Sequence, residues 1–174
     1  MTRGHSEVEI DTPVPAVREV VRRLFPQKWT KLYQEKLGDA FLRNAESPGV
    51  YAIAYSNKNL ESRHVREEDI FYIGMSNHAS VRSRLNRFRQ VLEKGRGHAG
   101  AKRFRKERAG GTPYSRLEPR TDFFVAWALV PCETKKKRRT PKDLRKMGVV
   151  AAVEMYALAR VLHKTGREPE LNEQ

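Results

Sequence analysis

The chain has 174 residues, a length typical of a single domain with its own hydrophobic core. Lys and Arg outnumber Asp and Glu by 35 to 21, and the formal net charge of +14 favours a polyanionic partner, most commonly nucleic acid. The single cysteine, Cys132, excludes an internal disulfide and a cysteine-based zinc cluster. The absence of a signal-peptide pattern and of an apolar run of about 20 residues predicts a soluble, cytoplasmic protein with no membrane partner.

Two helices are predicted near the N-terminus. Apolar residues follow a helical spacing after Pro15, a residue tolerated in a first helical turn. A second apolar series predicts a helix over residues 30–45. We therefore expect an N-terminal helical extension over residues 1–47, followed by the main domain over residues 48–174.

Three strands are predicted in the main domain. Residues 49–55 and 70–74 are rich in β-branched and aromatic side chains, and they should pair as an antiparallel hairpin with a long connection. Residues 122–130 are apolar on both faces of the expected strand, which predicts a central position in the sheet.

Two helices follow the hairpin, over residues 81–93 and 141–164, and Gly166 should end the second. Between them, residues 96–120 are glycine-rich and basic, which indicates a loop with one helical turn near residues 101–107. The order of elements predicts an α+β fold with a small, mainly antiparallel sheet flanked by helices.

Glu154 interrupts the apolar stripe expected along the last helix. That stripe comprises Met147, Val150, Ala151, Leu158 and Val161. A carboxylate in such a stripe is desolvated unless it meets a cation, a hydrogen-bond donor or a metal. Two interpretations stay open: a buried salt bridge to an arginine, or a ligand of a hard divalent cation such as Mg²⁺.

Two tyrosines occupy matched positions on the hairpin strands, in the segments Gly49-Val50-Tyr51 and Tyr72-Ile73-Gly74. Tyrosine alone is ordinary in a strand. The ordered pair resembles the signature of the GIY-YIG nucleases, with valine in place of the first isoleucine and a longer link between the tyrosines. The resemblance covers roughly residues 48–174, and it continues with an arginine on the next helix, a glutamate on a later helix and an asparagine near the end. Those residues are Arg84 or Arg82, then Glu154 and Asn172.

The resemblance implies a GIY-YIG-like fold and a metal-dependent endonuclease that hydrolyses double-stranded DNA, of a small restriction-type or mobile-element kind. It implies that Glu154 holds Mg²⁺, with Mn²⁺ as the alternative ion, and that Arg84 binds the phosphoryl oxygens. Tyr51 would accept the proton of the attacking water, and Tyr72 would orient the water or the phosphate. Asn172 would brace the site by hydrogen bonds.

Two assignments stay open within the resemblance. Arg82 has the shorter offset from Tyr72, whereas the segment from Arg84 to Phe88 better matches the family's Arg-Leu-x-x-aromatic helix start. His98 is either a solvent-exposed loop histidine or a group near the site, as in restriction-type members.

A strongly basic stretch follows the second hairpin strand. The residues expected along the DNA backbone are Arg82, Arg87, Lys102, Arg103 and Arg105. The charge run over residues 135–139 would extend that footprint, and a homodimer is left open. The alternatives are a non-catalytic nucleic-acid-binding module, a structure-selective repair nuclease and a basic RNA-associated structural protein.

Overall fold

A computed structural model describes residues 15–33, 40–117 and 121–172. It shows an α+β fold built on a four-stranded antiparallel sheet in the order β1-β4-β2-β3, which confirms the predicted fold class. The strands are β1 (Thr30–Lys31), β2 (Gly49–Ser56), β3 (Tyr72–Ser76) and β4 (Asp122–Leu129). The predicted antiparallel hairpin is β2 and β3, and β4 has a strand on either side, as its two apolar faces require.

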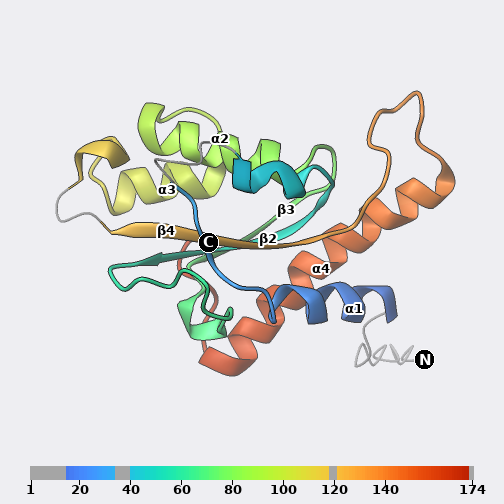
Figure 1. Cartoon of the computed structure of the whole chain (residues 1–174), viewed down its shortest axis with the longest axis horizontal. Helices are drawn as coiled ribbons and strands as arrows, with labels where there is room; N and C mark the ends of the chain where they lie inside the picture. Colours follow the sequence, from blue (N-terminus) through green and yellow to red (C-terminus); the bar gives the residue numbers. More distant parts are fainter. Residues whose placement is uncertain (1–14, 34–39, 118–120, 173–174) are drawn as a thin grey trace, which may run out of the picture.

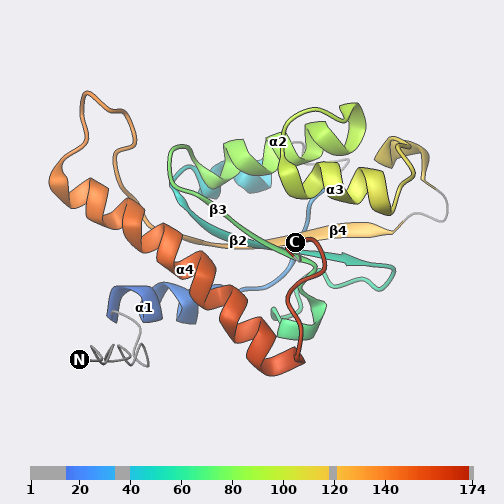
Figure 2. The same ribbon diagram turned by 180° about the vertical axis from the view of Figure 1, so that it is seen from behind.

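Helices cover both faces of the sheet, with α1 and α4 on one face and α2 and α3 on the other (Figures 1 and 2). The α-helices are α1 (Pro15–Leu24), α2 (Val81–Lys94), α3 (Ala99–Glu107) and α4 (Pro141–Thr165). Short 3-10 helices are η1 (Ala40–Ala45), η2 (Glu67–Asp69) and η3 (Tyr114–Arg116). Gly166 has a φ of 75° and ends α4, as predicted. Within the described ranges, no helix is long and apolar enough to cross a membrane.

The alternation of side chains along β2 divides the core into two layers. Val50, Ala52 and Ala54 pack against α1 and α4. Tyr51 and Ile53 point to the opposite face and pack against α2 and α3. Each helical layer therefore has its own set of strand side chains, and the candidate tyrosine belongs to the layer under α2 and α3.

The predicted helix over residues 30–45 is wrong at its start. Thr30 and Lys31 form β1, paired with Val125 and Phe124 of β4, and the Lys31 ammonium lies 2.7 Å from the Asp122 carboxylate. These cross-strand contacts outweigh the helical spacing of the apolar residues. Residues 34–39 lie outside the described ranges, and residues 40–45 are helical only as the 3-10 turn η1.

The first predicted helix is confirmed as α1, whose Val17, Val20 and Leu24 are buried. These side chains belong to the same apolar cluster as the sheet and α4. The division of the chain into an N-terminal extension up to residue 47 and a main domain from residue 48 stays a prediction.

The predicted loop over residues 96–120 contains more helix than the single turn that we expected. Helix α3 has nine residues, and the His98 side chain caps its N-terminus by accepting a hydrogen bond from the Ala101 amide. Ala101 and Phe104 are buried against the sheet. The many cations of this segment concealed its short apolar stripe.

Candidate active site

Tyr51 and Tyr72 converge at the β2–β3 pair. Tyr51 is fully buried, Tyr72 is half-buried, and their ring centroids lie 6.2 Å apart. Gly74 pairs with Tyr51 across the strands. A Cβ atom at Gly74 would lie 2.6 Å from Tyr51 Oη and 2.7 Å from Tyr72 Cε1, so the missing side chain is what allows both phenols to occupy this space.

His98 joins the two tyrosines. The imidazole is only 2% exposed, so the interpretation as a solvent-exposed loop histidine is wrong. Its Nε2 lies 2.7 Å from Tyr51 Oη, and its ring centroid lies 5.5 Å from that of Tyr72. Burial and the Arg84 charge lower the His98 pKa to about 3, so the ring is neutral at neutral pH.

The helix cap fixes the tautomer of that neutral ring. The Ala101 amide donates to His98 Nδ1 at 3.5 Å, so Nδ1 acts as an acceptor and carries no proton. The ring proton then lies on Nε2, which donates to Tyr51 Oη. Arg84 also donates to Tyr51, and Tyr51 in turn donates to Tyr72. The Tyr51 oxygen therefore accepts two hydrogen bonds and donates one.

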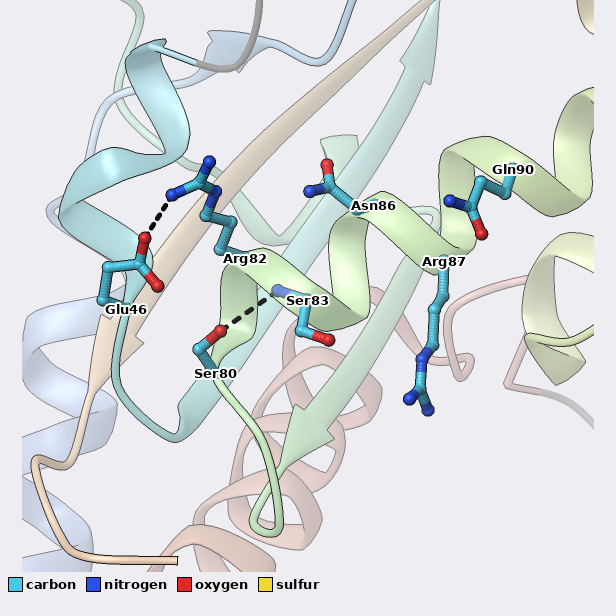
Figure 3. A pocket seen from close by; sticks show the side chains of 7 residues that line it. All are labelled: Glu46, Ser80, Arg82, Ser83, Asn86, Arg87 and Gln90. Atoms are coloured by element: carbon cyan, nitrogen blue, oxygen red, sulfur yellow. Dashed lines mark hydrogen bonds and ion pairs between the residues drawn. The ribbon is translucent and has the colours of Figure 1, made fainter.

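The arginine at the tyrosines is Arg84. Arg84 interacts electrostatically with both phenols, His98 and Glu154, and its buried Nε has no hydrogen-bond partner among the described residues. Arg82 lies about 200° away around α2. It forms an ion pair with Glu46 in a separate pocket of about 380 Å³ (Figure 3).

Glu154 reaches this site from the other helical layer. The buried stripe of α4 comprises Met147, Val150, Val153, Ala157 and Val161. On the helical wheel Glu154 lies between Met147 and Val161, inside the arc of this stripe, and it is half-buried. Its carboxylate accepts a hydrogen bond from the Met75 amide of the edge strand β3. Burial raises the Glu154 pKa, although the Arg84 charge and the Met75 hydrogen bond oppose the rise.

Asn172 braces the same strand edge. Its side-chain amide accepts from the Ile73 N–H and donates to the Ile73 carbonyl, both at 2.8 Å. The Leu171 amide donates to the Phe71 carbonyl, and Arg103 donates to the Leu171 carbonyl at 2.9 Å. Leu171 and Asn172 thus lie along the outer edge of β3, where Asn172 and Glu154 bond the outward-facing backbone groups of Ile73 and Met75.

A pocket of about 330 Å³ lies next to the β3–α2 connection, and Arg84 is among the residues that line it. Its lining residues are Met75, Ser76, Asn77, His78, Ala79, Ser83, Arg84 and Arg87. Arg84 and Met75, whose amide donates to the Glu154 carboxylate, both line this pocket.

The residues predicted to follow the DNA backbone divide into two groups. Arg87 and Lys102 are exposed, and Arg87 lines both pockets beside α2. Arg105 instead donates to the Gly111 and Glu93 carbonyls, which ties α3 to its neighbours. Arg103 donates to the Leu171 carbonyl, and Arg82 forms an ion pair with Glu46. Half-buried arginines bonded to backbone carbonyls stabilise the fold, and sequence alone did not distinguish them from exposed cations.

Comparison of the chain with protein-family models, curated proteins and solved structures finds no match. The candidate site therefore rests on its own geometry. Among the described residues, no three His, Cys, Asp or Glu side chains gather in a group that could hold a metal. Phe88 and Gly100 also shape the site and were missed, because their contacts with His98 and Tyr72 have no local sequence signal.

Proposed function

We propose that this chain is a metal-dependent endonuclease that hydrolyses phosphodiester bonds in double-stranded DNA. The observation that carries the proposal is the meeting of two phenols, a half-buried carboxylate and a guanidinium that lines a pocket, in a protein with a net charge of +14. These groups are drawn from β2, β3, α2 and α4, which are far apart in the sequence. Their types match the needs of phosphoryl chemistry: anion binding, proton transfer and cation binding.

Glu154 fits the role of a cation ligand. Mg²⁺ is often held by one or two carboxylates, with water and phosphate oxygens completing its coordination. Ionisation of Glu154 is less favourable in the folded protein than in water, because burial raises its pKa. A bound cation would stabilise the ionised carboxylate. When bound, Mg²⁺ or Mn²⁺ would stabilise the negative charge on the leaving 3′ oxygen and on the phosphate.

Arg84 would bind the phosphoryl oxygens. Its Nε is buried without a partner among the described residues, and such a donor is stabilised by an incoming acceptor. The guanidinium stays charged at all relevant pH values and presents donors in a fixed plane that matches phosphate. Phosphate binding would therefore use donor capacity that the fold leaves open.

Tyr51 is the candidate proton acceptor. Burial first, and then the neighbouring Tyr72, raise its pKa well above 10, so the phenol is protonated in the protein alone. The Arg84 charge and the hydrogen bond from Arg84 oppose this rise, because both stabilise negative charge on the Tyr51 oxygen. In the proposed reaction, Tyr51 first gives its own proton to solvent, and its phenolate then takes the proton of the attacking water. The water oxygen bonds to phosphorus, the bond to the 3′ oxygen breaks, and the leaving 3′ oxygen takes a proton from solvent.

Plasmid nicking tests the proposal. Wild-type protein with Mg²⁺ should nick supercoiled DNA, EDTA should abolish nicking, and Glu154→Ala should slow it by about 100-fold or more. Glu107→Ala serves as the matched control, because Glu107 is an exposed glutamate on α3 and its loss should leave the rate unchanged. Equal nicking by wild type and Glu154→Ala would indicate a contaminating nuclease and refute the assignment.

A non-catalytic DNA-binding module is the second candidate. The complete burial of Tyr51 favours it, since a catalytic base must reach the attacking water. Such a module would bind duplex DNA and leave the plasmid intact under every condition of the nicking assay. If nicking occurs, sequencing the ends left in a complex DNA distinguishes a restriction-type enzyme, which leaves discrete sites, from a structure-selective repair nuclease.

A further inference from the structure

A basic arm connects β4 to α4. It spans residues 131–140, extends beyond the sheet as a loop (Figures 1 and 2), and carries five consecutive cations. These are Lys135, Lys136, Lys137, Arg138 and Arg139. The first four are exposed and the fifth is half-buried.

The arm has a defined attachment to α4. Asp143 accepts hydrogen bonds from the Glu133 and Thr140 amides, at 3.1 and 2.8 Å, so one carboxylate joins the two legs of the arm. The Thr140 hydroxyl, which donates to Asp143 at 2.7 Å, and these two amides lower the Asp143 pKa to about 2, which keeps the carboxylate charged. Lys146 donates to the Pro131 carbonyl at 2.7 Å. Both ends of the arm are thus hydrogen-bonded to α4.

The cations themselves are uncommitted. Across the described ranges, no ion pair or side-chain hydrogen bond involves any of the five arm cations. Other cations of this chain are used internally, such as Arg108 with Glu170 and Arg160 with Glu67. Five adjacent like charges repel one another, and a polyanion relieves that repulsion. The arm therefore has free capacity for several phosphates.

The strand register places the arm beside the candidate site. Gly49 at the start of β2 pairs with Ser76 on one side and with Leu129 on the other. The arm, which follows Leu129, and the pocket next to Ser76 therefore lie at the same end of the sheet. Adjacent strands are about 4.8 Å apart, so Leu129, where the arm begins, and Ser76, beside the pocket, are separated by about 10 Å. Each leg of the arm spans at most about 16 Å, and its tip lies within about one turn of duplex, roughly 34 Å, from the pocket.

We propose that the basic arm is a second DNA-contacting surface, which binds duplex phosphates within about one helical turn of the phosphate held at Arg84. This inference rests on the proposed function. It assigns to an element outside the hydrolytic site the task of aligning the duplex over that site. Because the arm touches neither phenol nor Glu154, it should affect substrate binding and leave the chemical step unchanged.

The test compares two charge-matched variants. In the arm variant, all five cations become Gln, which lowers the formal charge from +14 to +9. In the control variant, five exposed cations around α1 and the β2–β3 connection become Gln, with the same charge change. They are Arg18, Arg22, Arg23, Lys28 and Arg63. Binding to a 30-base-pair duplex is measured between 50 and 300 mM NaCl in EDTA, with nicking kinetics in Mg²⁺ as the second readout.

The arm variant should lose about 100-fold or more in affinity near 150 mM salt, and its salt slope should fall by about 3 to 4, since each phosphate contact contributes about 0.9. Its KM should rise while kcat stays at the wild-type value. The control variant should change the slope by less than about 1. Equal losses in the two variants, or a wild-type slope in the arm variant, would overturn the inference about the arm. The absence of nicking by every protein, wild type included, would instead overturn the proposed function.

Discussion

Gly74→Ala tests how tightly the two phenols depend on one another. The added Cβ would lie 2.6 Å from Tyr51 Oη and 2.7 Å from both Tyr51 Cζ and Tyr72 Cε1. Ordinary carbon contacts are about 3.5–4.0 Å, so the rings must move by about 1 Å. Tyr51 is fully buried and bonded to His98, which leaves it no free direction. We expect a loss of about 1–3 kcal/mol of stability and a fall of roughly 2–10 °C in Tm.

The same displacement should slow nicking by about 100-fold, because a misplacement of about 1 Å in a catalytic group costs that much. Thermal unfolding and initial nicking rates measure the two effects. Gly148→Ala on α4 is the matched control, since a Cβ there meets nothing within 4 Å. Alanine favours the helix by about 0.5–1 kcal/mol over glycine, so this control should raise Tm and keep the wild-type rate. A Gly74→Ala protein with wild-type Tm and rate would refute the reasoning.

Three further predictions concern stability. Without divalent ions at pH 7, Glu154→Gln should unfold at a higher temperature than wild type. Burial raises the pKa of the Glu154 carboxyl in the folded protein, so folding favours its protonated form, and the stability of the wild type falls as the pH rises through the pKa of the folded state. In calorimetry, Mg²⁺ at a hundredfold excess over Kd should raise the wild-type Tm by roughly 5–10 °C and leave the variant unchanged; equal shifts would contradict the ligand role. Asn172→Ala should lose about 1–3 kcal/mol in urea unfolding, since two hydrogen bonds to Ile73 disappear. His98 has a pKa of about 3 against 6.5 in the unfolded chain, so wild-type stability should fall as pH drops from about 6.5 towards 3, and His98→Gln should flatten that fall.

Much of the fold was predictable because local patterns and tertiary packing agree. The apolar residues of β4 point to both faces, and the strand is central as that composition requires. Gly166 ends α4 in the left-handed conformation that favours glycine. The two hairpin strands pair antiparallel across a long connection, and their register brings Tyr51 opposite Gly74.

Local patterns failed where long-range contacts decide the structure. Thr30 and Lys31 begin the segment predicted to be helical from its apolar spacing, but they form β1 by pairing with the edge of β4. The wheel places Glu154 among buried residues, but it cannot show that the carboxylate meets the Met75 amide and Arg84. His98 has no neighbouring sequence signal for burial, and its position depends on the packing of α3 against the sheet.

The central claim is that Arg84 and Glu154 act in one hydrolytic site. It is tested most directly by initial nicking rates in Mg²⁺ for wild type, Arg84→Ala, Glu154→Ala and the double variant. Groups that act as a unit are strongly non-additive, so we predict that each single variant loses about 100-fold or more and that the double variant is little slower than the slower single one. Losses that multiply in the double variant, or a near-wild-type rate in either single variant, would contradict the claim.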